Sequence, residues 1–233
     1  MCGRYTLTDP GDLLDVLEVE TDDDTPELGA RYNIAPTQGV AAVRRIESDD
    51  ADLDGTRTLR LLHWGLVPFW AKDRAIGNRM INARAETAAS KPAFRAAFKR
   101  RRCLLLADGF YEWVAQESGP KQPYHIHLPE RQPFTFAGLW ERWDKDPDVG
   151  TIDSCTILTC DASEAMEPYH HRMPVFLEGD ARDAWLDPET SPDALQELLR
   201  PYAGTLEFTP VSRMVNNPRN EAPGCVEPIE RMA

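Results

Sequence analysis

The sequence lacks long apolar runs. No stretch of its 233 residues approaches the roughly 20 consecutive apolar residues that a membrane-spanning helix needs. Its first residues also lack the basic and apolar regions of a secretory signal peptide. These absences predict a cytoplasmic protein with no membrane partner.

Cysteine is scarce and irregularly spaced. The five cysteines include no C-x-x-C pair, and they are Cys2, Cys103, Cys155, Cys160 and Cys225. An odd number without paired spacing indicates reduced thiols, not a disulfide framework or a zinc site. We therefore expect no structural disulfide, no metal and no cofactor.

Basic residues are outnumbered. Lysine and arginine total 26 against 39 acidic residues, which gives a net charge of −13 and at first argues against a nucleic-acid partner. The distribution is uneven, because residues 70–102 hold ten basic and two acidic residues, a local charge of +8. Residues 9–27 hold nine acidic residues and no basic one. The sequence thus predicts a basic surface for a polyanion and an acidic surface turned away from it.

Repeats, low-complexity tracts and linkers are also missing. A chain of this length with 42% hydrophobic residues can bury one good core, so we expect a single domain over residues 1–233. Two polar segments, residues 47–56 and 144–150, are predicted to be surface loops.

Most of the regular patterns present in the sequence are typical of β-strands. Short apolar or β-branched runs predict strands at residues 39–46, 59–66, 103–107, 111–114, 124–128, 134–139, 152–160 and 206–211. Helical spacing predicts helices at residues 86–99, 182–186 and 192–199. Asp9 as an N-cap, with Pro10 at the first helical position, predicts a further helix with an apolar face over residues 13–17. This order predicts an α+β fold around a mixed or antiparallel sheet, with peripheral helices.

Cys2 is notable for its position. A small second residue allows removal of Met1, which would leave a thiol and an α-amine on adjacent carbons. Their ordinary pKa values, roughly 8.5 and 7.7 to 8.0, leave part of each deprotonated near neutrality. Such a pair reacts with aldehydes, because the amine forms a Schiff base and the thiolate then closes a thiazolidine ring. The alternative is a buried cysteine with no chemical role.

Six short segments share one resemblance. They are residues 2–4 (CGR), 31–37 (RYNIAPT), 64–70 (WGLVPFW), 81–87 (INARAET), 107–113 (ADGFYEW) and 170–175 (HHRMPV). In this order they closely resemble the SRAP family, named for the SOS response and known as abasic-site DNA–protein crosslinking proteins. The similarity runs from Cys2 to at least Pro174, and residues 210–212 resemble the family's C-terminal part.

The resemblance implies four catalytic residues. Cys2 would attack C1′ of the ring-opened deoxyribose through its amine and then its thiol. Glu112 would act as general acid and base, although a lone glutamate in an aromatic run is often an exposed strand residue. His170 would exchange protons with the sugar oxygen, and we choose it over His171 because the family pattern is His-x-Arg-Met-Pro. Asn82 would fix the amine or the sugar.

The resemblance also implies contacts to single-stranded DNA with abasic sites. Arg4, Arg84 and Arg172 would bind phosphates, because guanidinium groups fit phosphate oxygens; the alternative for each is a surface ion pair. Asn33 would support the same pocket, unless it is an ordinary turn asparagine.

Two aromatic residues complete the predicted DNA site. Phe69 and Trp70 would form a wedge that stacks on bases, although Phe69 could instead pack in the core. The basic run at residues 99–102 is a weaker phosphate candidate, because it follows a predicted helix and could interact with that helix's C-terminal dipole.

Two other functions use the same residues. An N-terminal-nucleophile hydrolase, a cysteine peptidase or amidohydrolase, would use the Cys2 thiol on an amide with its own amine as base. Against it, only Met1 precedes Cys2, so no propeptide would need autocatalytic removal. A noncatalytic single-strand binding module would leave Cys2 idle. The sequence does not fix the oligomeric state, and a monomer is the working expectation.

Overall fold

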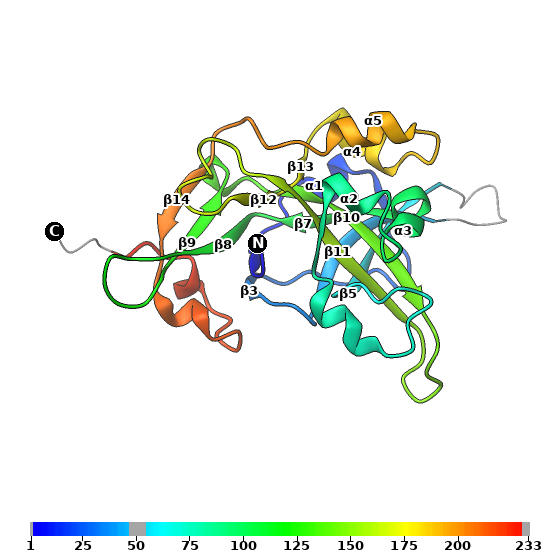
Figure 1. The fold of residues 1–233 in the computed structure, drawn as a ribbon, viewed down its shortest axis with the longest axis horizontal. Coiled ribbons are helices and arrows are strands. Elements are labelled where there is room, and N and C mark those ends of the chain that lie inside the picture. The colour runs from blue at the N-terminus through cyan, green and yellow to red at the C-terminus, as the bar shows by residue number, and fades with distance from the viewer. Residues whose placement is uncertain (1, 47–54, 230–233) are drawn as a thin grey trace.

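The strands form two sheets. The computed structural model describes residues 2–46 and 55–229 (Figure 1). Within these ranges the larger sheet has nine strands, namely β2 (Val19–Glu20), β4 (Gly39–Arg45), β5 (Arg57–Trp64), β6 (Asn82–Arg84), β7 (Arg102–Ala107), β10 (Phe134–Trp143), β11 (Ile152–Asp161), β12 (Arg172–Pro174) and β13 (Phe176–Leu177). The smaller sheet has the order β14-β9-β8-β1-β3, with β1 (Tyr5–Leu7), β3 (Arg31–Ile34), β8 (Gly109–Val114), β9 (Gln122–His127) and β14 (Glu207–Pro210).

The larger sheet closes on itself. Its path runs β12-β11-β10-β7-β4-β5-β2, and β5 pairs in addition with β11, where His63 lies opposite Ser154. Strands β11, β10, β7, β4 and β5 therefore form a closed ring. The β5–β11, β6–β11 and β2–β5 pairs are parallel, and the other strand pairs that the structure describes are antiparallel. This confirms the predicted mixed or antiparallel sheet.

An aromatic cluster joins the two sheets. Tyr5, from the smaller sheet, packs edge-on against Trp64 with ring centroids 5.2 Å apart and against Phe136 at 5.8 Å. All three side chains are fully buried. Because Tyr5 belongs to β1, these contacts bring the beginning of the chain into the apolar core.

The helices lie outside the sheets (Figure 1). They are α1 (Leu13–Val16), α2 (Ala85–Ala88), α3 (Arg95–Arg100), α4 (Asp180–Leu186) and α5 (Pro192–Leu198), with 3-10 turns η1 (Arg74–Arg79), η2 (Pro129–Arg131), η3 (Arg213–Asn216) and η4 (Pro223–Cys225). This confirms the α+β fold with peripheral helices. None of the helices in residues 2–46 and 55–229 has the length and apolarity to cross a bilayer.

Most predicted elements are present. Each of the eight predicted strands overlaps an observed one, and the predicted helices at residues 182–186 and 192–199 are α4 and α5. Residues 144–150 form an irregular, largely exposed connection between β10 and β11, as predicted. Of the other predicted loop, residues 47–54 lie outside the described residues.

Two helix predictions were wrong in their bounds. Residues 86–99 form two separate helices, α2 and α3, because Pro92 lies between them and disfavours helical backbone at the residue before it. The first helix begins at Leu13, not after Asp9, because the Asp9 carboxylate accepts a hydrogen bond from the Gly11 amide at 2.8 Å and closes a turn.

Strand β5 ends at Trp64, directly before Gly65 and two residues before the predicted end of the strand. The Gly65 φ of +136° suits glycine, and a Cβ there would lie 2.7 Å from the carbonyl oxygen of Gly77. This close approach of two backbones fixes the start of the loop that carries Phe69 and Trp70.

We predict that Gly65→Ala lowers the free energy of unfolding by about 3 kcal/mol or more, because it combines backbone strain with a clash against main chain. Gly119→Ala is the matched control, since Gly119 has a φ of +84° and no atom near its missing Cβ. Urea denaturation should show the control losing only about 1 kcal/mol. Equal losses would contradict the role of the backbone contact.

Candidate active site

Cys2 lies inside the protein. Its residue is fully buried just before β1, and its carbonyl accepts a hydrogen bond from Asn82 Nδ2 at 2.7 Å. Burial raises the pKa of the Cys2 thiol well above its ordinary value, and the Glu112 carboxylate adds to the shift. The positive charge of the N-terminus and a hydrogen bond from the thiol to the Arg4 carbonyl act in the opposite direction. The thiol is therefore held in its protonated form.

Glu112 lies on β8, the strand that pairs with β1. The two strands are in register at Tyr5 and Phe110, and the Tyr111 amide donates to the Arg4 carbonyl at 3.0 Å. Glu112 is buried, which raises the pKa of its carboxyl, while the charge of the N-terminus opposes the shift. Because the Glu112 charge acts on Cys2, the sheet brings the two predicted catalytic residues close together.

His170 precedes β12 and is half-buried. Its Nδ1 lies 2.9 Å from the Arg172 amide nitrogen and 3.1 Å from the Arg172 carbonyl oxygen, so the Arg172 backbone fixes the orientation of the ring. Burial lowers the pKa of His170, and the positive charge of the N-terminus lowers it further. The neighbouring His171 is exposed and stacks on His170 with ring centroids 4.3 Å apart. Electrostatics thus couples His170 to the same N-terminus as Glu112.

Asn82 lies on β6, which runs parallel to β11 with Asn82 opposite Ile157. While its Nδ2 holds the Cys2 carbonyl, its Oδ1 is buried and has no hydrogen-bond partner among the described residues. An amide that is fixed at one end and open at the other can accept a hydrogen bond from a group bound beside Cys2.

The predicted DNA-binding residues differ in exposure. Arg84 is exposed at the end of β6, and Phe69 and Trp70 are 50% and 47% exposed. Core packing, the alternative for Phe69, is therefore wrong. Phe69 instead lines a cleft of about 900 Å³ together with the apolar Phe98 and Leu195 and the basic Arg95, Lys99 and Arg100. None of the four predicted catalytic residues lines this cleft.

Arg172 has other partners than phosphate. It is buried, and its guanidinium forms ion pairs with Glu86 at 2.7 Å and Asp161 at 2.6 Å and donates to the Thr159 carbonyl at 2.5 Å. These bonds join β12 to β11 and α2. The geometry therefore corrects the predicted role, because Arg172 fixes the strand that follows His170 and has no exposed guanidinium for DNA.

Asn33 is also fully buried, so the side chain does not reach DNA as predicted. Arg4 is half-buried and donates to Asn33 Oδ1 at 2.6 Å. The fold brings these two residues together, Asn33 from β3 and Arg4 from the position just before β1.

Residue-type reasoning missed Asp108, which holds β1 in place. Its carboxylate accepts hydrogen bonds from Thr6 Oγ1 and the Thr8 amide, both at 2.5 Å. The next residue, Gly109, lies against a buried histidine, since a Cβ there would be 2.1 Å from His125 Nε2. The Asp108-Gly109 pair, where Glu112's strand begins, was the available signal for this tight junction.

The described residues contain no group of three His, Cys, Asp or Glu side chains arranged as metal ligands. The candidate site therefore consists of a thiol, a carboxyl, an imidazole and an amide around the beginning of the chain. Such a set can move protons at a carbonyl carbon while a nucleophile attacks it.

This fold and site define a class of protein. Residues 1–218 match the family described as SOS response associated peptidase (SRAP), so the chain belongs to that family. Abasic site processing protein YoqW of Bacillus subtilis is 40% identical over 230 residues, covering 97% of this chain and 99% of that protein. Abasic site processing protein HMCES of Gallus gallus is 36% identical over 225 residues, covering 85% of this chain and 66% of that protein.

Solved structures share the fold. A protein of Bacteroides thetaiotaomicron superposes with a TM-score of 0.84 over 98% of this chain and 100% of that one, at 21% identity. A phage-related protein of Bordetella bronchiseptica gives a TM-score of 0.66 at 31% identity, covering 91% of this chain and 95% of that one.

Burial of Glu112 predicts a pH-dependent stability. Because its pKa is raised in the folded state, folded protein keeps a proton that unfolded protein releases above the ordinary glutamate pKa of about 4.3. The free energy of unfolding of the wild type should therefore fall, relative to Glu112→Gln, as pH rises through this window. Urea denaturation across the window measures this difference. The control, Glu117→Gln, removes an exposed carboxylate, so its free energy of unfolding should depend on pH as that of the wild type does. If Glu112→Gln also shows the wild-type pH dependence, the prediction is contradicted.

Proposed function

We propose that this protein forms a covalent crosslink to abasic sites in single-stranded DNA through Cys2, after removal of Met1. The observation that carries the proposal is the position of Cys2, a fully buried residue at the beginning of the chain, whose carbonyl is held by Asn82 and whose thiol responds to the Glu112 charge. The relatives named abasic site processing proteins support it.

The chemistry balances with the loss of one water. The Cys2 α-amine adds to the aldehyde carbon C1′ of the opened sugar, and the carbinolamine loses water to give an imine. The thiol then adds across the imine, so that an S–C bond forms at C1′ and the nitrogen receives a proton. The product is a thiazolidine that keeps both phosphodiester bonds of the strand intact.

Each step needs proton transfer near Cys2. Because burial keeps the thiol protonated, ring closure needs a base, and Glu112 is the carboxylate whose charge acts on that thiol. His170, whose ring is held by the Arg172 backbone, is suited to donate a proton to the sugar oxygen as the ring opens and to the carbinolamine hydroxyl as water leaves. Asn82 Oδ1 is suited to accept from the terminal amine and direct it towards the sugar.

The exposed residues suit an unpaired strand. Arg84 continues from Asn82 along β6 and is free to meet a phosphate, while Phe69 and Trp70 offer aromatic surfaces on which bases of any sequence can stack. An abasic sugar has few base edges to read, so reactivity of the aldehyde supplies specificity. A stacked duplex would oppose entry of the sugar into a buried pocket by roughly a few kcal/mol.

The first test is denaturing gel electrophoresis of Met1-free protein with single-stranded DNA that carries one abasic site. We expect a shifted band that requires both the lesion and Cys2, with no band for intact DNA or for Cys2→Ala. Absence of the band at low and high salt would overturn the proposal and favour the hydrolase. Unchanged DNA retention by Cys2→Ala would instead favour a binding module.

A second test uses Cys2→Ser, which keeps the amine but closes a less stable ring. The longer-lived imine at C1′ should permit β-elimination of the 3′ phosphate, so strand cleavage should rise relative to the wild type. The products are measured on a sequencing gel, with Cys2→Ser on intact DNA as the control. An uncut abasic strand would contradict the imine intermediate.

A further inference from the structure

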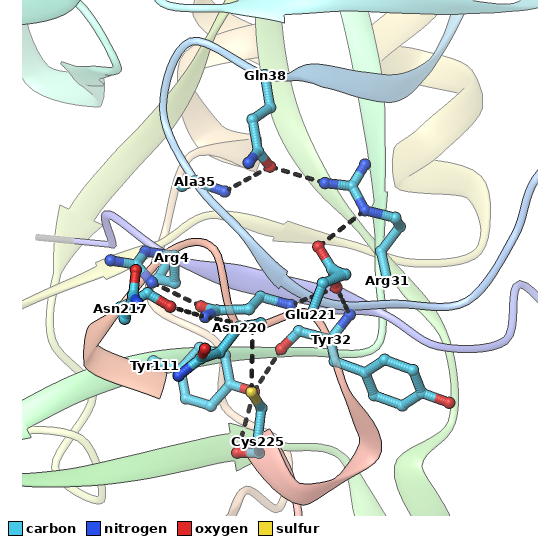
Figure 2. Close-up of polar contacts among 11 residues, drawn as sticks. Arg4, Arg31, Tyr32, Ala35, Gln38, Tyr111, Asn217, Asn220, Glu221 and Cys225 are labelled. Atoms are coloured by element: carbon cyan, nitrogen blue, oxygen red, sulfur yellow. Dashed lines mark hydrogen bonds and ion pairs between the residues drawn. The ribbon is translucent and has the colours of Figure 1, made fainter. Parts of the chain in front are cut away.

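A polar cluster fastens the C-terminal segment beside the candidate site. We call residues 213–225, from η3 to η4, the C-terminal clasp. Figure 2 shows Asn217, Asn220, Glu221 and Cys225 of the clasp turned towards Arg4 and the β3 residues around Tyr32. None of the steps proposed above uses this cluster.

Asn33 is the centre of the cluster. Its Nδ2 lies within hydrogen-bond distance of three clasp carbonyls, those of Val215, Asn217 and Asn220, at 3.2, 3.0 and 2.9 Å. Its backbone amide donates to Glu221 Oε1 at 2.9 Å. A fully buried side chain with this many partners has one available orientation, which aims its Oδ1 at Arg4.

Glu221 fastens the clasp at a second point. Besides the Asn33 amide, its carboxylate accepts from the Tyr32 amide and pairs with Arg31 Nε at 3.1 Å (Figure 2). Arg31 in turn donates to Gln38 Oε1 at 2.7 Å. The clasp is thus joined to β3 by a charged group as well as by Asn33.

Arg4 receives its orientation from this cluster. Its Nη1 donates to Asn33 Oδ1 at 2.6 Å and to the Val215 carbonyl at 2.8 Å, and no carboxylate pairs with it among the ion pairs of the described residues. Its guanidinium lies 5.8 Å from the centre of the Trp113 ring. Because no carboxylate in the described part of the chain pairs with it, this half-buried cation depends on these neutral acceptors for its place.

The cluster also contacts the chain close to Cys2 and close to Glu112. The Arg4 carbonyl accepts from the Cys2 thiol at 3.7 Å and from the Tyr111 amide at 3.0 Å. The Tyr111 hydroxyl donates to the Tyr32 carbonyl at 2.7 Å, with the Cys225 carbonyl at 3.3 Å. A displaced clasp would therefore shift Arg4, two residues after Cys2, and Tyr111, one residue before Glu112.

We infer that Asn33 is a positioning residue for the crosslinking reaction, which acts through Arg4 and makes the C-terminal clasp a part of the site. This inference rests on the proposed function. It assigns Asn33 an internal role instead of the DNA contact that the sequence suggested. It predicts that Asn33 affects the alignment of Cys2 and has little effect on the strength of DNA binding.

Single-turnover crosslinking distinguishes these effects. Met1-free protein is mixed with increasing single-stranded abasic DNA, which gives a saturating rate and a half-saturating concentration. Asn33→Ala should lower the saturating rate about tenfold or more, because small displacements of a nucleophile are costly, and should change the half-saturating concentration by less than about threefold. Thr135→Val is the control, since it removes a buried 2.7 Å hydrogen bond to the Leu177 carbonyl outside the clasp, and should change neither value.

A double-mutant cycle tests the route through Arg4. Arg4→Gln should slow the saturating rate in the wild type and have a smaller effect in Asn33→Ala, since the two residues act as a unit. If Asn33→Ala does not fold, Arg4→Lys decides, because lysine keeps the charge but cannot reproduce the guanidinium geometry, and the saturating rate should fall.

Three results would overturn the inference: a wild-type saturating rate in Asn33→Ala, a wild-type rate in Arg4→Lys, or effects of Asn33→Ala and Arg4→Gln that simply multiply. These results differ from failure of the proposed function, in which the wild type itself forms no crosslink.

Discussion

The hydrogen bond from Asn82 to the Cys2 carbonyl ties the beginning of the chain to a strand made eighty residues later. A chain terminus is normally free at the surface, whereas here the first strand pairs on both sides, with β3 and β8, and Tyr5 is part of the aromatic core. The arrangement of the other groups depends on this fixed start. Glu112 is near Cys2 because β8 is the partner of β1, and Asp108 fixes the junction that leads into β8.

Burial shifts the pKa values of the catalytic groups so that each neutral form is favoured. It favours the neutral forms of the Cys2 thiol, the Glu112 carboxyl and the His170 imidazole, while the charge of the N-terminus acts on all three. Groups held in their neutral forms can exchange protons with little reorganisation, which suits the several proton transfers of the proposed reaction. The exposed side chains predicted to bind DNA differ in kind, because Phe69 and Trp70 are aromatic and the cleft beside Phe69 is partly basic.

The sequence predicted the strands well because alternation and β-branched runs depend on local pattern alone. It failed for very short strands such as β6 and β12, which exist because β11 offers them a partner. The sequence also identified site residues by motif, but it did not predict which residues contact them in the fold. Arg172 lies in a motif, but its two ion-pair partners lie elsewhere in the sequence. Asp161 is separated from it by a connecting loop, and Glu86 belongs to another segment. Asn33 likewise gave no sign of the clasp, whose residues follow almost two hundred positions later.

The clasp makes the order of synthesis matter. Cys2 is synthesised before Asn33, yet Asn33 reaches its partners only when residues 215–221 have been made. At about 5 to 20 residues per second, this interval lasts roughly 10 to 45 seconds. During that time the thiol and amine are together, but the base, the amide and the clasp that align them are not all present. The proposed reactive centre at Cys2 is therefore complete only after the clasp has been made.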